Sequence, residues 1–151
     1  MSMGKPMANY AAARRVGDFV FLSGVVAVDP ATRRAVRGYE DIPQAARAAL
    51  QGLGYDTGQM SVDVFEAAIV AQSWFVLERI RQIAAEHGGT MDDVVKLVQY
   101  FRRLPDYAFY NRVRGLFYPI EPPVSTVVEV SRFLPGDEVL VEVEGTMYLP
   151  R

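Results

Sequence analysis

The sequence predicts one α+β domain, with a mixed, mostly antiparallel sheet of five to six strands and two helices packed on one face. Short stretches rich in β-branched and aromatic residues near both ends of the chain are typical of strands. Two segments between them repeat apolar residues at helical spacing. With 151 residues, 50% of them hydrophobic, residues 1–151 have the length and apolar content of a single domain.

The domain opens with a predicted hairpin. Residues 12–16 and 19–28 form its two strands, and Gly17-Asp18 between them is a turn-forming pair. Asp29 is followed by a proline, which ends the second strand.

A less regular segment follows over residues 31–66. Residues 41–50 have the composition of a short helix, and three glycines punctuate what comes after them. We therefore expect an extended loop insertion at about 31–66 that contains one short helix. A connection of this length is more often functional or interface-forming than idle.

The clearest helix begins at Ala67. Its apolar face repeats at spacings of four and three residues, through Ile69, Ser73, Val76, Ile80 and Ile83. Gly88-Gly89 should end this helix, because glycine tolerates the left-handed conformation of a helix cap. Thr90 and Asp93 then have the spacing of a capping box that introduces a single turn.

The second half of the chain predicts three more strands and a second helix. Residues 94–101 are β-branched and aromatic, which favours a strand. Pro105-Asp106 breaks that strand and begins a helix with apolar residues at helical spacing. Strands at 125–131 and 138–148 complete the order β-β-loop-α-β-α-β-β.

The last strand indicates that the second face of the sheet is not simple core. Val141 and Val143 share one side of this strand, whereas Glu142 and Glu144 share the other. The helices pack on only one face of the sheet, so something else must pack on the other face. We expect self-association through it, because closed homo-oligomers are common and small-molecule sites often lie at their seams.

Composition excludes several classes of function. The chain has no cysteine and a single histidine, so disulfides, thiolate nucleophiles, Cys-based zinc sites and His-rich metal sites are excluded, and no cofactor or metal is expected. A net charge of −2 gives no basic field for nucleic acid. The apolar stretches fall short of the roughly 20 residues of a membrane span, and residues 1–7 lack a signal-peptide core, so we expect a cytoplasmic protein.

Several short motifs follow one another along the chain. They are Tyr10, RVGDFVFLSG at 15–24, DDVVK at 92–96, DYAFYN at 106–111, PPVSTVVEVSR at 122–132 and VEVEG at 141–145. In these motifs the chain resembles the RidA/YjgF family, whose members are also labelled endoribonuclease L-PSP. The resemblance implies a chorismate-mutase-like fold and a homotrimer with small-molecule clefts between its subunits.

The resemblance also implies a set of cleft residues. In deaminating members an arginine binds the substrate carboxylate, and Tyr, Ser, Asn and Glu surround the site of imine hydrolysis. The last four positions fall here on Tyr10, Ser23, Asn111 and Glu144. The arginine position falls on Val124, and the small residue two positions later is Thr126. Valine cannot form the bidentate pair of a guanidinium with a carboxylate, which argues against standard 2-imino acid deamination.

Each candidate has a structural alternative. Glu144 with Glu142 on the same side of the strand could raise one pKa enough for acid–base catalysis, or both could face solvent. Ser23 has no neighbouring His or Lys in sequence, so its role would be hydrogen bonding in the site or at a strand end. Tyr10 could contact a ligand or simply pack, and Asn111 could cap a loop. Arg132 is the arginine at a family-matching position that could replace the missing anchor.

Three functions remain open from sequence. The first is hydrolysis of an imine or enamine metabolite at Glu144, in the manner of a deaminase such as 2-aminomuconate deaminase. The second is a non-catalytic trimer that binds a metabolite. The third and least favoured is an endoribonuclease, which only the family label supports. We expect a homotrimer with a small-molecule ligand at its subunit interfaces, and neither nucleic acid nor membrane as a partner.

Overall fold

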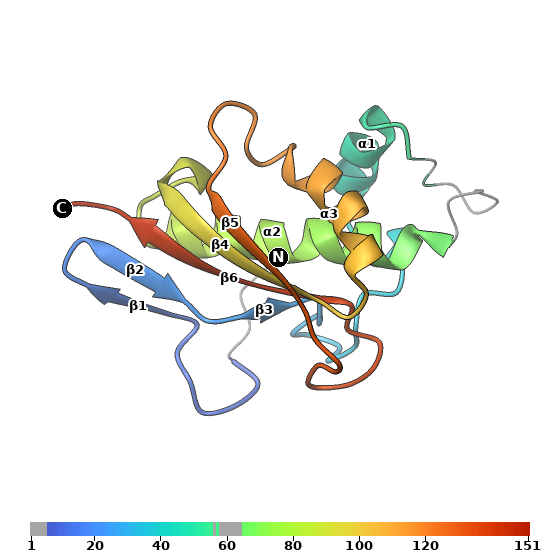
Figure 1. The fold of residues 1–151 in the computed structure, drawn as a ribbon, viewed down its shortest axis with the longest axis horizontal. Helices are drawn as coiled ribbons and strands as arrows, with labels where there is room; N and C mark the ends of the chain where they lie inside the picture. Colours follow the sequence, from blue (N-terminus) through green and yellow to red (C-terminus); the bar gives the residue numbers. More distant parts are fainter. Residues whose placement is uncertain (1–5, 56, 58–64) are drawn as a thin grey trace.

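The computed structural model describes residues 6–55, 57 and 65–151 (Figure 1). Part of the 31–66 insertion, including the glycine at position 58, therefore lies outside the described residues. The helices and strands, in chain order, are β1 Ala13–Val16, β2 Phe19–Leu22, β3 Val25–Val26, α1 Gln44–Gly52, α2 Ala67–Glu86, β4 Val94–Phe101, α3 Tyr107–Arg114, β5 Val124–Glu129 and β6 Val141–Tyr148.

One six-stranded sheet organises the molecule. The strand order is β1-β2-β6-β4-β5, and β3 pairs with β6 beyond the end of β2. Only β4 and β5 run parallel among the described pairs, because the connection through α3 returns the chain to the same end of the sheet. The predicted α+β class with a mixed, mostly antiparallel sheet is confirmed.

The two main helices lie on one face of this sheet. α2 packs against β6, β3 and α3 (Figure 1). The Tyr110 ring on α3 meets the Phe101 ring of β4 edge-on, with centroids 5.2 Å apart. Both rings are fully buried, so α3 belongs to the same helical layer as α2.

The third helix, α1, corresponds to the short helix expected at 41–50, but it begins later. Pro43 is its N-cap and has an extended backbone, as does Ile42 before it. A proline disfavours the helical conformation of the preceding residue, so the helix cannot start until Gln44. The short helix thus extends to Gly52 rather than ending at Leu50.

A buried amide joins the helical layer to two loops. Gln72 of α2 donates to the Val36 and Glu138 carbonyls at 2.9 and 2.8 Å. Its carbonyl oxygen accepts the Leu140 backbone N–H at 2.9 Å. The side chain is 1% exposed, so a single polar group fixes the segments before α1 and before β6 against α2.

The predicted strand at 19–28 is interrupted at Ser23-Gly24. Phe21 pairs with Thr146, and Val25 pairs with Val143. Three residues, 22–24, therefore stand opposite only two, 144–145, on β6. This extra residue has the character of a β-bulge, which bends a strand and often lies next to a functional site.

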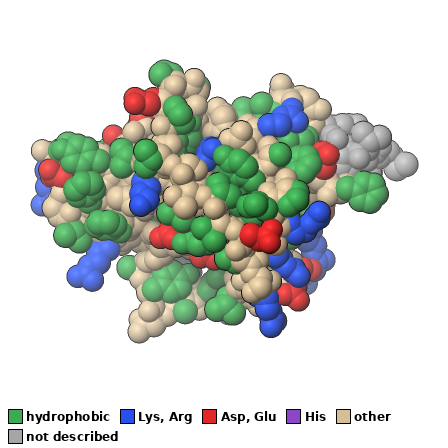
Figure 2. Space-filling view, in the orientation of Figure 1, with side chains coloured by type: hydrophobic (Ala, Val, Ile, Leu, Met, Phe, Trp, Pro, Cys, Tyr) green, Lys and Arg blue, Asp and Glu red, His purple; other side chains and the backbone are tan. Residues whose placement is uncertain are grey.

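The outer face of the sheet carries exposed apolar side chains. Phe19, Phe21 and Tyr148 are 44%, 49% and 46% exposed, and Val16 and Val124 on the outer strands are 58% and 66% exposed. Figure 2 looks onto this face and shows hydrophobic side chains gathered over the hairpin and over the middle of the sheet. Within the described chain nothing covers them.

Candidate functional site

Two pockets meet at Gly24, beside the interrupted strand. The first, here called the acidic pocket, has a volume of about 320 Å³ and is lined by Gly24, Tyr100, Val130, Arg132, Phe133, Glu142 and Glu144. The second, here called the N-terminal pocket, has a volume of about 420 Å³, and its polar lining comes from Tyr10, Ser23, Asp29, Arg33 and Arg79. Gly24 lines both pockets, so they adjoin one another.

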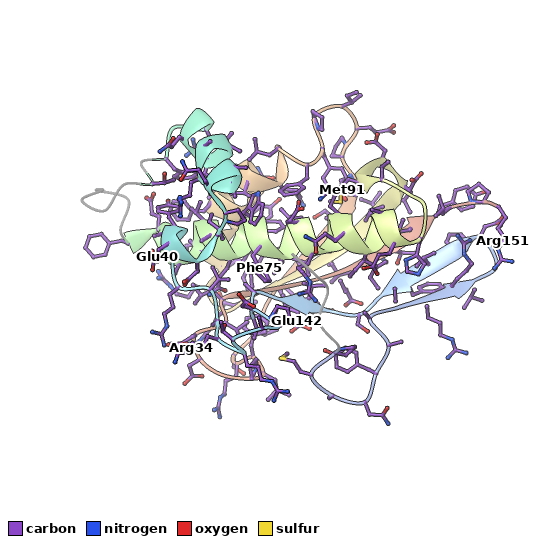
Figure 3. All side chains as sticks on the ribbon, turned by 180° about the vertical axis from the view of Figure 1, so that it is seen from behind. Arg34, Glu40, Phe75, Met91, Glu142 and Arg151 are labelled. Atoms are coloured by element: carbon purple, nitrogen blue, oxygen red, sulfur yellow. The ribbon has the colours of Figure 1, made fainter. Side chains whose placement is uncertain are left out.

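Two carboxyl groups project from β6 into the acidic pocket. Glu142 lies opposite Tyr100 of β4 and Val26 of β3, and Figure 3, seen from the helix side, places it beside β3. Glu144 lies two residues further along the same side of the strand. The Tyr100 hydroxyl donates a short hydrogen bond to Oε1 of Glu144. The pocket therefore holds one carboxylate with a phenol partner and one without.

The electrostatics of these groups differ accordingly. Burial raises the pKa of Glu142, and the negative charge of Glu144 raises it further. The hydrogen bond to Glu144, with smaller contributions from burial and from the two carboxylates, raises the pKa of Tyr100 to about 12. Tyr100 thus remains a neutral donor at physiological pH, while Glu142 holds a proton more strongly than an ordinary glutamate does.

A close contact with Gly24 fixes the position of Glu142. A Cβ atom at residue 24 would lie 2.0 Å from Oε1 of Glu142. The carboxyl group therefore occupies the space that any side chain at this position would fill. The Ser23-Gly24 break in the hairpin strand is what allows Glu142 to reach the junction of the two pockets.

Arg132 also lines the acidic pocket. Its Nε lies 4.0 Å from Oδ1 of Asp137, and the Arg132 side chain is 81% exposed. Val130 and Phe133 supply an apolar wall. An acid pair, a phenol and an exposed guanidinium therefore share one small cavity.

Tyr10 and Ser23 line the N-terminal pocket. The Ser23 hydroxyl donates to the Ala11 carbonyl at 2.6 Å, and its backbone N–H donates to the Ala12 carbonyl at 3.0 Å. The hydroxyl proton of Ser23 is thus engaged in a hydrogen bond that attaches the segment before β1 to the end of β2. Ser23 keeps its hydroxyl oxygen as an acceptor, and Tyr10, 45% exposed, keeps its ring at the mouth of the pocket.

Asn111, Val124 and Thr126 lie away from both pockets within the described chain. Asn111 projects from α3, and its Oδ1 accepts a hydrogen bond from Arg114 at 2.8 Å. Val124 and Thr126 are exposed on β5, an edge strand of the sheet. A single chain therefore brings together only four of the seven predicted residues: Tyr10, Ser23, Arg132 and Glu144.

A buried glutamine orders the region around Asn111 and β5. Gln99 Oε1 accepts from the Tyr110 hydroxyl at 2.9 Å and from Arg114 at 2.6 Å. Its Nε2 donates to the Thr126 carbonyl at 2.8 Å and to the Ser125 hydroxyl at 2.9 Å. Because the amide has donors on one side and acceptors on the other, its orientation is fixed.

Sequence reasoning missed Tyr100, Gln99 and Arg79. The polar pair Gln99-Tyr100, between Val98 and Phe101 in a mostly apolar strand, was a signal for the first two, because a buried polar group needs partners. Arg79 interrupts the apolar pattern of α2, and its position on the pocket side depends on tertiary packing.

Comparison with known proteins places this site in a family. The family model described as endoribonuclease L-PSP matches residues 49–148. The chain belongs to the endoribonuclease L-PSP family. This is the RidA/YjgF family that the sequence motifs resemble, so that prediction is confirmed.

Relatives within the endoribonuclease L-PSP family span nearly the whole chain. A solved structure from Klebsiella pneumoniae, named only as a candidate endoribonuclease, is 55% identical with a TM-score of 0.87 and covers 93% of this chain and 100% of its own. A RutC family protein of Pyrococcus abyssi is 33% identical over 95% of this chain and 89% of its own length. The 3-aminoacrylate deaminase RutC of Acinetobacter baylyi is 26% identical over 95% of this chain and 90% of its own length.

Two further features of the described residues bear on function. In the ranges given above, His, Asp and Glu nowhere gather in a group of three or more that could hold a metal ion. Over the same ranges, every helix is too short or too polar to cross a membrane.

Proposed function

We propose that this endoribonuclease L-PSP family member hydrolyses a small imine or enamine to a carbonyl compound and ammonia. The observation that carries the proposal is the acid pair of the acidic pocket, in which the pKa of Glu142 is raised and Glu144 is held by Tyr100. Pairs of carboxyl groups whose surroundings separate their pKa values suit one group to act as acid and the other as base. The relative named 3-aminoacrylate deaminase supports the same reaction class.

The chemistry requires one proton donor and one proton acceptor. Protonated Glu142 gives its proton to the imine nitrogen, which makes the carbon electrophilic. Water attacks that carbon, and a carboxylate of the pair takes a proton from the water. The carboxyl group that took the water proton then protonates the nitrogen of the carbinolamine. Ammonia leaves as the hydroxyl proton returns to the carboxylate, which gives the carbonyl product and restores the protonated carboxyl group. An enamine enters the same sequence after protonation at its β-carbon.

The proposal includes a homotrimer with clefts between subunits. The acidic pocket opens on the outer sheet face, where Phe19, Phe21 and Tyr148 are exposed. Burial of such a face stabilises an assembly by about 25 cal/mol for each Å² of apolar surface. A second subunit on this face would narrow the pocket and bring its own groups to it. Asn111, Val124 and Thr126 belong to the proposed cleft through this assembly.

Ammonia release from freshly generated imines tests the reaction. We would supply 2-iminopropionate, 3-aminoacrylate and 2-aminomuconate in turn and measure ammonia against buffer alone. We expect turnover of at least one substrate and a loss of about 100-fold or more in Glu142→Gln, since general acid–base catalysis contributes typically 10²–10⁴-fold.

Glu138→Gln is the matched control. Glu138 is exposed, pairs with Arg37 at 3.3 Å and lines neither pocket of the described chain. We expect this variant to keep wild-type turnover. Equal turnover by Glu142→Gln and the wild type would contradict the proposal.

One observation favours a second candidate, a non-catalytic trimer that binds a metabolite. By the motif resemblance alone, Val124 falls where the family's deaminating members carry an arginine, and its exposed side chain offers no anchor for a carboxylate. This candidate is favoured if all three substrates remain unchanged while Glu142→Gln alters ligand affinity alone. The family label of endoribonuclease has no comparable support, because the net charge is −2.

A further inference from the structure

Tyr100 of β4 is held between the acid pair and an apolar cluster. It lies directly opposite Glu142 in the ladder with β6 and directly opposite Val128 in the ladder with β5. It also packs against the small buried cluster that contains Val28 and Phe133. Strand pairing on both sides and apolar contacts therefore fix the phenol beside the acidic pocket, which Tyr100 lines.

The Tyr100 hydroxyl reaches one carboxyl group of the pair and not the other. It donates to Oε1 of Glu144, although Glu142 is the residue directly across from it on β6. A phenol has a single proton to donate, so this bond leaves none for Glu142. Among the described residues, no other side chain donates to Glu142 in its place. One hydroxyl thus makes the pair unequal.

This inequality decides where a shared proton resides. Two neighbouring carboxyl groups in a semi-enclosed pocket do not readily both become charged, so they titrate as a coupled pair. A hydrogen bond donated to one of them favours the charged form of that group, and its negative charge then favours a proton on the other. The raised pKa of Glu142, which comes from burial and from the charge of Glu144, agrees with this order.

The other charged groups near the acid pair act less directly. Arg132 lines the same pocket, but its side chain is 81% exposed. Lys96 lies four residues before Tyr100 on the same side of β4 and is exposed, and β3 presents only valines. Beyond Gly24, the charged residues of the adjoining N-terminal pocket are Asp29, Arg33 and Arg79. Salt weakens the effect of exposed charges, whereas Tyr100 contacts its carboxylate directly.

We propose that Tyr100 is the positioning residue that assigns the two roles in the acid pair. By donating its hydrogen bond to Glu144, it holds that group as the carboxylate and leaves the transferable proton with Glu142. Tyr100 acts through Glu144 and does not give up its own proton, because its pKa of about 12 keeps the phenol neutral. The catalytic consequence rests on the proposed function, whereas the order of protonation is a property of the free protein.

Carbon-13 NMR of the glutamate side-chain carboxyl groups reports the order of protonation without any substrate. The two signals are assigned by their absence from Glu142→Gln and from Glu144→Gln. In the wild type we expect the last proton of the pair to leave from Glu142. In Tyr100→Phe, which keeps the ring and removes only the hydroxyl, we expect both signals to take part in that last step.

Tyr118→Phe is the matched control for loss of a phenol hydroxyl. The Tyr118 hydroxyl is buried without a hydrogen-bond partner among the described residues, and Tyr118 lines neither pocket of the described chain. We expect this variant to titrate as the wild type does. A last proton that leaves the wild type from Glu144, or a division of the last step that is the same in Tyr100→Phe and the wild type, would overturn the proposal.

The pH profile of ammonia release separates this role from a structural one. We expect Tyr100→Phe to be slower by about tenfold, because its proton is divided between the two carboxyl groups. Its kcat/KM should also fall at a higher pH than that of the wild type, because the doubly charged pair has lost a hydrogen bond. A profile in the wild-type position would overturn the proposal, whatever the rate. If the wild type releases no ammonia, the proposed function fails, and the NMR titration still decides the order of protonation.

Discussion

Glu142 and Glu144 occupy the same side of β6 but have different partners. Tyr100 donates a hydrogen bond to Glu144, whereas Glu142 lies against the backbone of Gly24. From sequence we expected the hydrolysis to take place at Glu144. The structure places both carboxyl groups in one pocket and raises the pKa of Glu142, so our proposal gives the proton-donating role to Glu142 and keeps Glu144 as its coupled neighbour.

The raised pKa of Glu142 predicts how stability depends on pH. The folded protein binds this proton more tightly than the unfolded chain, in which a glutamate has a pKa of about 4.3. The stabilisation is complete below that value and is lost as the pH rises through the higher folded pKa. We expect the melting temperature of Glu142→Gln, measured by circular dichroism, to equal that of the wild type near pH 4 and to exceed it near pH 7. If the variant's advantage in melting temperature shrinks as the pH rises toward 7, the raised pKa of Glu142 is contradicted.

Individual site residues differ in how far the sequence could predict them. Tyr10, Ser23 and Glu144 were predicted from family motifs. Tyr10 precedes β1, Ser23 follows β2 and Glu144 lies on β6, and each of them lines one of the two pockets. Arg79 could not be found in this way, because its place in the lining of the N-terminal pocket follows from how α2 packs in the folded chain. Tertiary packing of this kind leaves no record in the spacing of residues along the sequence.

Among the elements, the interruption between β2 and β3 does most to shape the site. Gly24→Ala would place a Cβ atom 2.0 Å from Oε1 of Glu142, so the carboxyl group must move away from the junction of the pockets. We expect turnover to fall by about tenfold or more, since small displacements of a catalytic group are costly.

Gly52→Ala is the control for this substitution. Gly52 ends α1, and a Cβ atom there meets nothing within 4 Å. We expect unchanged turnover and a stability gain of up to about 1 kcal/mol. Wild-type turnover in Gly24→Ala would show that the position of Glu142 does not matter.

The Gln99 network attaches edge strand β5 and helix α3 to the sheet. Gln99→Leu leaves the Tyr110 hydroxyl, 0% exposed, without its acceptor. We expect a loss of about 1–3 kcal/mol in the free energy of unfolding, measured by urea denaturation. Gln44→Leu on the exposed side of α1 should change stability by less than about 0.5 kcal/mol. Equal effects of the two substitutions would show that the network contributes nothing.

Elements with strong local patterns were predictable, and elements shaped by distant contacts were not. The β4 strand was predicted with its observed bounds, Val94–Phe101, and the Thr90–Asp93 capping box is present. The break at Ser23-Gly24 was not predicted, because it depends on Glu142, far along the chain. The late start of the last strand at Val141 likewise follows from pairing with Phe101 of β4.

At the scale of the whole molecule, we propose that the outer sheet face mediates the assembly on which function depends. We expect the wild type to have three times the 16.8 kDa mass of one chain in light scattering coupled to size exclusion. Phe21→Glu on this face should dissociate the assembly and abolish turnover, because the proposed clefts form between subunits.

Phe65→Glu is the control for this experiment. Phe65 is 95% exposed and lies just before α2 rather than on the sheet. We expect it to keep the mass of the wild type. A monomeric wild type, or a Phe21→Glu variant that remains trimeric and active, would contradict the assembly.

The pH dependence of kcat/KM for ammonia release, with wild type and Glu142→Gln side by side, tests the central claim most directly. We expect wild-type turnover above the buffer rate, with kcat/KM falling as the pH rises through the raised pKa of Glu142. Glu142→Gln should be slower by about 100-fold or more and should lack that fall. A variant with the rate and pH profile of the wild type would show that Glu142 does not supply the proton.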